Sequence, residues 1–121
     1  MTQEASLNQF FSSFEMPAFP NIAVPDEQPY PYITYPVVSG TFDDDAFLSV
    51  YIYTKGEATS EITAKVRAIT DELKNGGKHL PCDGGYVWLT LGNPIVNYLC
   101  DPKDTSVRYA VLNVNCEFLT V

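Results

Sequence analysis

Residues 46–73, AFLSVYIYTKGEATSEITAKVRAITDEL, change from one hydrophobic period to another within a single stretch. In residues 46–54 the side chains alternate, and this period of two predicts a strand with two different faces. One face carries Leu48, Val50 and Ile52. The other carries Phe47, Ser49, Tyr51 and Tyr53. We expect the aliphatic face to be buried.

The second half of this stretch predicts a helix. Its apolar side chains recur at spacings of three and four, which form one stripe on a helical surface. These residues are Ile62, Val66, Ile69 and Leu73. Thr59 or Ser60 is the expected N-cap, with Glu57 and Glu61 near the positive end of the helix dipole. The Asn-Gly-Gly sequence at residues 75–77 is expected to stop the helix.

Upstream of residue 46, residues 30–39 predict a strand, and residues 40–45 predict the turn that pairs it with residues 46–54 as a long antiparallel hairpin. Residues 16–31 are rich in proline and predict an extended connector. Before them lies an apolar helical stripe formed by Leu7, Phe10, Phe11 and Phe14. Ser6 is the expected cap of this first helix, and Pro17 its end.

Downstream of the helix, residues 86–91 and 95–100 predict two short strands after an Asp-Gly-Gly turn. Residues 101–104 predict another turn. Residues 108–120 alternate throughout, which predicts a long last strand. One face of it would carry Ala110, Leu112, Val114, Cys116 and Phe118. The other would carry Tyr109, Val111, Asn113, Asn115 and Glu117.

These elements predict an α+β fold in a single domain spanning residues 1–121. We expect an antiparallel or mixed sheet that contains a long hairpin and is packed on one face by two helices.

The chain carries a formal net charge of −8, from seven Lys and Arg against fifteen Asp and Glu. Binding to nucleic acid or to an anionic membrane surface needs clustered cations, so this charge balance argues against both kinds of partner. The three cysteines form an odd set without a Cys-x-x-Cys pair, which argues against a disulfide framework or a zinc knuckle. The sequence contains no recognisable signal peptide or membrane-spanning stretch. We expect a protein kept in a reducing cytoplasm.

One group of residues could support catalysis, namely His79, Cys82 and Asp83. A thiol nucleophile needs a base within hydrogen-bond distance and a third group to orient that base. The family signatures of such nucleophiles are absent, and a cysteine beside a turn is more often a small packed hydrophobe. No other nucleophile, phosphate-binding or metalloprotease motif is present. We therefore expect no enzyme activity and no cofactor.

Asp43, Asp44 and Asp45 lie in the turn before the strand at residues 46–54. Calcium loops use oxygen ligands that converge, usually from alternating positions, whereas three consecutive side chains point in different directions. The residues are therefore more often a solvated turn than a metal site. A further interpretation is that they supply a negative field to an assembled surface.

The tyrosines of the predicted hairpin are Tyr30, Tyr32, Tyr35, Tyr51 and Tyr53. Aromatic residues on paired strands are more often cross-strand packing pairs than a ligand platform. They are also favoured at subunit interfaces, where a flat ring buries a large area.

Several short stretches resemble one family. Residues 24–26 (VPD), 31–35 (PYITY) and 40–44 (GTFDD) resemble the front half of small minor capsid or tail-completion proteins from long-tailed phages. Residues 80–88 (LPCDGGYVW) and 92–94 (GNP) resemble their second half. The resemblance covers nearly the whole chain, and it extends to the order of the predicted elements.

The resemblance implies a tail terminator similar to that of phage lambda, present in the virion at the head-proximal end of the tail and assembled in the host cytoplasm. Such proteins form a hexameric ring that caps the tail tube, ends its elongation and presents a surface for the connector of the head. The implied partners are further copies of the chain, the tube protein and the head-side connector or stopper. DNA would pass through the ring without specific binding, and no membrane would be involved.

For such a ring we expect Asp43, Asp44 and Asp45 to face the lumen or a neighbouring ring. Tyr30, Tyr32, Tyr35, Tyr51 and Tyr53 are the expected subunit contacts. A head-closure or stopper protein of the same phage neck is the alternative within this class. Outside it, the alternatives are a thiol enzyme built on Cys82 and His79, or an adaptor that adds a peptide to an exposed strand edge.

Overall fold

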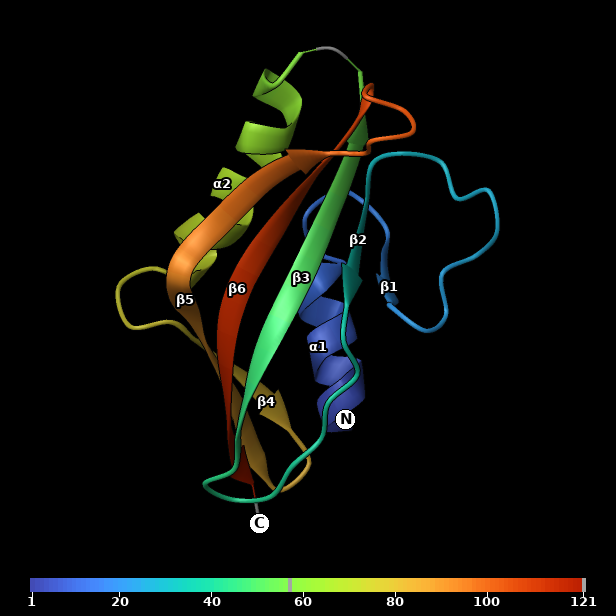
Figure 1. The fold of residues 1–121 in the computed structure, drawn as a ribbon. Coiled ribbons are helices and arrows are strands. Elements are labelled where there is room, and N and C mark those ends of the chain that lie inside the picture. The colour runs from blue at the N-terminus through green and yellow to red at the C-terminus, as the bar shows by residue number, and fades with distance from the viewer. Residues whose placement is uncertain (57, 121) are drawn as a thin grey trace.

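In the part of the chain that the structure describes, six strands form one mixed sheet. The structure is a computed structural model that describes residues 1–56 and 58–120. In chain order the elements are α1 (Gln3–Phe11), β1 (Ala18–Pro20), β2 (Tyr32–Tyr35), β3 (Asp45–Lys55), α2 (Ser60–Leu73), β4 (Lys78–Cys82), β5 (Gly85–Cys100) and β6 (Val107–Thr120). The strand order across the sheet is β1-β2-β3-β6-β5-β4. Strands β1 and β2 are parallel, and the other neighbours are antiparallel (Figure 1).

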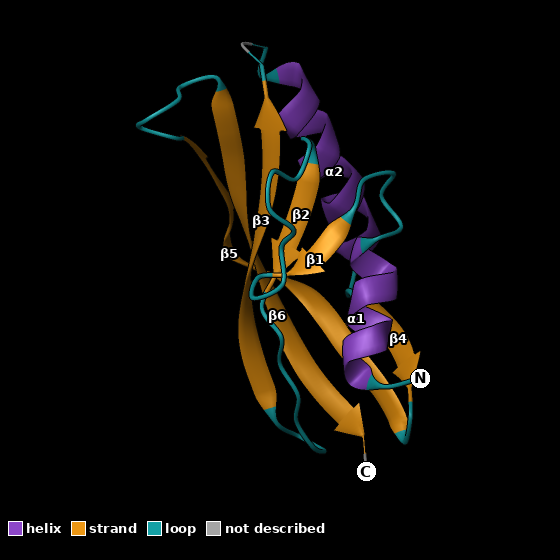
Figure 2. Ribbon diagram, turned by 90° about the vertical axis from the view of Figure 1, so that its right-hand side faces the viewer, coloured by secondary structure: helices purple, strands orange, loops and turns teal. Residues whose placement is uncertain are grey.

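Both helices lie on one face of the sheet, as Figure 2 shows. The apolar stripe of α2 is buried as predicted, because all four of its members face the sheet. The predicted inner faces of β3 and β6 are buried against it. This confirms the α+β fold with two helices packed on the sheet. None of the described helices is long and apolar enough to cross a membrane.

The last strand, β6, is one of the two central strands of the sheet, beside β3. It pairs with β3 from Asp45↔Glu117 to Lys55↔Val107, and with β5 on its other side. The predicted hairpin between residues 30–39 and 46–54 forms only in part, since β2 is short and pairs with β3 through residues 32–34 alone. The long hairpin of this fold is instead β5–β6.

Strand β5 joins the two short strands predicted at residues 86–91 and 95–100. Its register with β6 shifts between Leu91 and Val96, where the backbone of Gly92 lies close to Asn113. The Asn113 side chain is buried and donates to the Pro94 carbonyl at 2.8 Å. The predicted break between two strands is therefore a β-bulge within one strand, and the Asn113–Pro94 hydrogen bond stabilises it.

Two short edge strands were not predicted. β1 lies within the predicted connector, where Ala18 pairs with Ile33, and β4 contains His79, in a stretch for which no strand was predicted. Each is short and contains a proline, Pro20 or Pro81. A proline removes a backbone donor, so these strands have the composition of a loop although tertiary contacts hold them extended.

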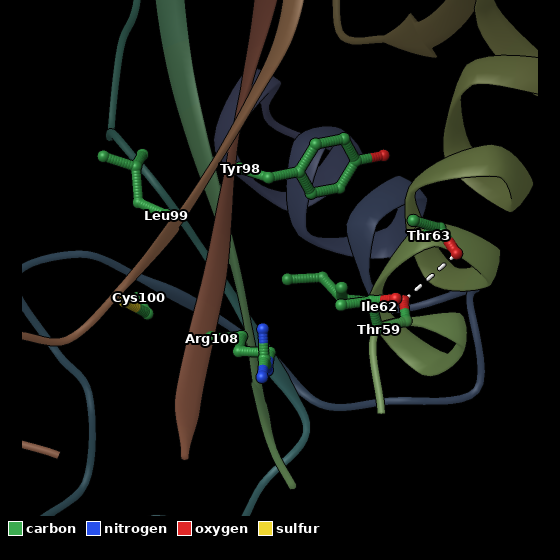
Figure 3. Close-up of a pocket in the computed structure, with 7 residues that line it drawn as sticks. All are labelled: Thr59, Ile62, Thr63, Tyr98, Leu99, Cys100 and Arg108. Atoms are coloured by element: carbon green, nitrogen blue, oxygen red, sulfur yellow. Dashed lines mark hydrogen bonds between the residues drawn. The ribbon is translucent and has the colours of Figure 1, made fainter. Parts of the chain in front are cut away.

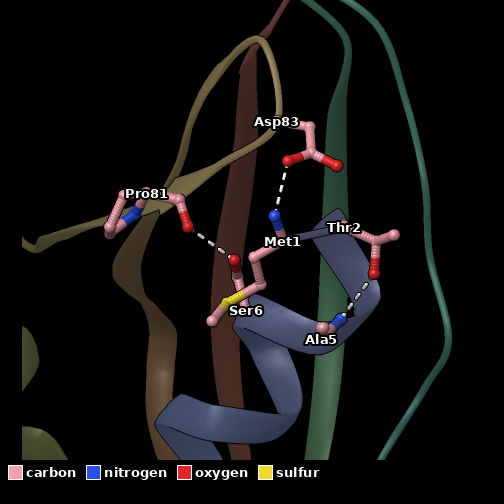
Figure 4. A network of polar contacts seen from close by, with 6 residues as sticks. All are labelled: Met1, Thr2, Ala5, Ser6, Pro81 and Asp83. Atoms are coloured by element: carbon pink, nitrogen blue, oxygen red, sulfur yellow. Dashed lines mark hydrogen bonds and ion pairs between the residues drawn. The ribbon is translucent and has the colours of Figure 1, made fainter.

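The first helix begins earlier than predicted. Its N-cap is Thr2, whose hydroxyl accepts from the Ala5 amide at 3.0 Å (Figure 4). Ser6 lies inside the helix, is buried, and donates to the Pro81 carbonyl at 2.6 Å. The expectation that Ser6 caps the helix was wrong, because its hydroxyl is used to attach α1 to β4. For α2, Thr59 is the N-cap residue, and Glu57 lies outside the described residues.

Candidate assembly surfaces

The face of the sheet opposite the helices carries a row of stacked aromatic rings. Strand alternation places Tyr51 and Tyr53 of β3 on this outer face, since Leu48, Val50 and Ile52 face the helices. The register then adds Tyr32 of β2, opposite Tyr53, and Tyr109 of β6, also opposite Tyr53. Among the described residues, both helices lie on the other side of the sheet (Figure 2). The outer face therefore has no second layer of secondary structure.

Tyr53 is the centre of this aromatic face. Its ring centroid lies 4.9 Å from Tyr32, 5.8 Å from Tyr109 and 6.0 Å from Tyr51. Tyr30 extends the row, with its ring 5.5 Å from Tyr32. We use "aromatic face" for these five residues, which confirm the predicted cross-strand packing between β2 and β3.

Two phenols at the centre of this face, those of Tyr32 and Tyr53, have a raised pKa. Burial, with the neighbouring tyrosines adding to it, raises the pKa of Tyr53 above its usual value. Burial and the adjacent Tyr30 raise the pKa of Tyr32 in the same way. The aromatic face offers large, partly covered rings with polar hydroxyls, which suits contact with another protein surface.

Tyr35 does not belong to this surface. It follows Tyr32 by three positions in β2, so alternation turns it toward the helices. It is only 3% exposed, stacks on Phe11 at 5.2 Å and accepts a hydrogen bond from the Asn8 side chain at 2.8 Å. Tyr109 takes part instead. The sequence placed Tyr109 on the outer side of its strand, but only the β3–β6 register brings it to Tyr53.

Asp43, Asp44 and Asp45 form an exposed acidic loop at the start of β3. The Asp44 carboxylate accepts from the Thr41 amide at 2.9 Å and from the Thr41 hydroxyl at 3.2 Å. The loop backbone bonds twice to β6, through Asp43 and Asp44 with Phe118. In the part of the chain that the structure describes, no group of acidic, His or Cys side chains is arranged to hold a metal ion. Asp44 therefore stabilises the turn, while Asp43 and Asp45 flank it.

His79 and Cys82 lie on opposite faces of β4. His79 is exposed and stacks on Trp88 with the rings 5.4 Å apart and nearly parallel. Cys82 faces the helix side with Leu80, and burial, aided by the charge of Asp83, raises the pKa of its thiol. A nucleophile needs the opposite change, a lowered pKa beside a base. The imidazole and the thiol are not arranged as a catalytic pair.

A groove lies between the far end of β5 and the first turns of α2, with a volume of about 470 Å³. Figure 3 shows Tyr98 pointing from β5 toward α2, while Leu99 points away from it. Ile62 and Thr63 form the α2 side, and Cys100 and Arg108 the sheet side. The sequence contained no signal for this groove, because it depends on how the β5–β6 hairpin curves past α2.

No protein-family model matches the chain, and no curated protein matches it in sequence. The class that fold and surfaces define is an α+β protein with helices on one sheet face, an aromatic outer face, an acidic loop at one end and an apolar groove at the other.

Proposed function

We propose that this protein is a structural component of a phage tail, a terminator whose subunits form a ring on the tail tube. The aromatic face carries the proposal. Rings that are only partly covered by one another, on a sheet face without a second layer, have the character of a subunit interface. The resemblance of five stretches to tail-completion proteins, together with the α+β fold, supports the particular class.

The two short outer strands of the sheet are poor sites for the addition of a peptide strand. A peptide adaptor of the strand-adding kind needs an edge with free, regularly spaced backbone groups. The two outer strands, β1 and β4, are short and each contains a proline, which are common ways to blunt an edge. This observation argues against strand addition at β1 and β4; β5 beyond Leu89 has no strand partner on the β4 side among the described residues.

The charge of the chain suits a ring around a DNA path. Each copy carries −8, so a closed ring of six would present a strong negative field to DNA. Like-charge repulsion would keep passing DNA from adhering to the wall. In this role the ring ends tube growth, and its free side meets the connector of the head.

The first test is native mass spectrometry of the purified chain over a concentration series, alone and with the tube protein of the phage that encodes it. We expect a species of six subunits and, by electron microscopy, a ring at one end of each tube, with tube length limited by its addition. A chain that stays monomeric under both conditions would overturn the proposal. A ring that binds the head connector but not the tube would identify a stopper instead.

A further inference from the structure

The acidic loop presents an apolar side chain at its tip. Phe42 is 65% exposed, and its neighbours Asp43 and Asp45 are exposed carboxylates. The loop is held in place from several sides, because Asp44 binds Thr41, the loop backbone binds Phe118, and Gln3 donates to the Gly40 carbonyl at 2.7 Å. A tip that is already ordered loses little conformational entropy when it inserts into a partner.

The groove between β5 and α2 has complementary chemistry. Its walls include Ile62, Tyr98 and Cys100, and Tyr98 is 49% exposed although it faces the helix side. Arg108 contributes a cation to the lining, with its Nε donating to the Gly56 carbonyl at 3.2 Å. A volume of about 470 Å³ lies in the range of clefts that enclose small-molecule-sized groups, so it can hold a phenyl ring.

The loop and the groove cannot meet within one molecule. Asp45 and Lys55 mark opposite ends of the β3–β6 ladder, and ten steps along a strand span roughly 33 Å. The loop lies at the lower end of the sheet in Figure 1, whereas α2 begins at the upper end. An acidic, apolar tip at one end and an apolar groove with an arginine at the other are complementary between two copies.

We infer that the Phe42 loop of one copy inserts into the β5–α2 groove of a second copy, with Asp43 and Asp45 beside Arg108. Because the two surfaces differ, the contact is head-to-tail and can repeat around a closed ring. The inference rests on the ring proposed above and names one contact between its subunits, in addition to the aromatic face. It places the acidic loop against a neighbouring subunit instead of the lumen.

A mixing experiment tests this contact. Phe42→Ala removes the tip but leaves the groove, and Thr63→Trp fills the groove but leaves the tip. We expect each variant alone to associate about thirtyfold more weakly, the effect of losing one aromatic anchor. An equimolar mixture should form a one-to-one dimer, because one intact loop and one intact groove remain. Ile22→Ala, which removes another exposed apolar side chain, should assemble like the wild type.

A crosslink provides an independent measurement. Phe42→Cys places a thiol at the tip, opposite the native Cys100 of the groove on the neighbouring copy. Mild oxidation should then give a ladder of covalent oligomers on a non-reducing gel, and adding Cys100→Ser should abolish every species above a dimer. Circular dichroism and urea unfolding should confirm that each variant is folded.

The outcomes separate the inference from the proposed function. A six-subunit wild type with equally stable rings in Phe42→Ala and Thr63→Trp, and no ladder from Phe42→Cys, would overturn the loop–groove contact and leave the ring proposal intact. A wild type that stays monomeric with and without tube protein would overturn both.

Discussion

Cys116 illustrates how a single residue depends on its position in the sheet. It lies on the inner face of β6, is almost fully buried, and burial raises the pKa of its thiol to about 12. The thiol therefore acts as a small apolar side chain beneath the helices. Cys100, by contrast, is exposed at the groove, and Cys82 is half-buried in β4.

The buried thiol makes the free energy of unfolding decrease with rising pH in the alkaline range. The folded pKa lies above the ordinary value of 9.0, so the unfolded state releases its proton first. The contribution of Cys116 is complete below about pH 9 and is lost as pH rises toward 12. We expect the free energy of unfolding in urea to fall more steeply above pH 9 for the wild type than for Cys116→Ser. Cys100→Ser, an exposed control, should keep the wild-type slope; equal slopes for all three proteins would contradict the assignment.

At the scale of elements, the attachment of α1 to the rest of the fold depends on polar contacts at its start. Ser6 bonds the Pro81 carbonyl of β4, and Gln3 bonds Gly40 and Thr120 at 2.7 and 2.9 Å. The apolar side of the helix supplies Leu7, Phe10 and Phe11 to the common core. The start of the helix thus links β4, at one edge of the sheet, to the end of β6 and to the loop before β3.

Ser6→Ala should destabilise the protein by about 1–3 kcal/mol, since it leaves the partly buried Pro81 carbonyl without its partner. Thr2→Ala should cost about 1 kcal/mol, the usual effect of losing an exposed N-cap. Urea unfolding of both variants measures the difference, with exposed Ser12→Ala as a control close to neutral. A larger loss for Thr2→Ala than for Ser6→Ala would show that capping, and not the bond to β4, is the main contribution of this segment.

At the scale of the whole molecule, the two sides of the sheet have different roles. The helix side holds the core, and the outer side holds the aromatic face. The two ends also differ. Asp45 lies opposite Glu117 at one end of the β3–β6 ladder, whereas Arg108 lies at the other end together with Lys55, which pairs with Asp104. Such a directional subunit is suited to head-to-tail assembly.

The double variant Tyr51→Ser, Tyr53→Ser should shift ring formation to at least about tenfold higher concentration, because it removes two aromatic contacts. Native mass spectrometry over a dilution series measures the shift. Tyr86→Ser, an exposed tyrosine outside the aromatic face, is the matched control. Unchanged ring formation in the double variant would remove the aromatic face from the subunit contacts.

The sequence by itself determined the strongly periodic elements. The faces of β3 and β6 and the buried stripe of α2 follow from periods of two and 3.6, because each face is decided by its own side chains. The tertiary structure alone decided which segments without such a period became strands. β1 and β4 are held extended by their partners, although their prolines favour a loop.

Strand register explains the remaining differences. In the candidate site, Tyr109 belongs to the aromatic face and Tyr35 does not. The face on which a side chain lies depends on its position in the strand, and its neighbours depend on which strands are paired. Ser6, which was predicted to cap α1, donates instead to the Pro81 carbonyl, because the tertiary structure places β4 beside the helix. The groove and the loop lie near opposite ends of the β3–β6 ladder, about 33 Å apart. The sequence could not predict this pair of surfaces, because the groove forms only where the curved β5–β6 hairpin passes α2.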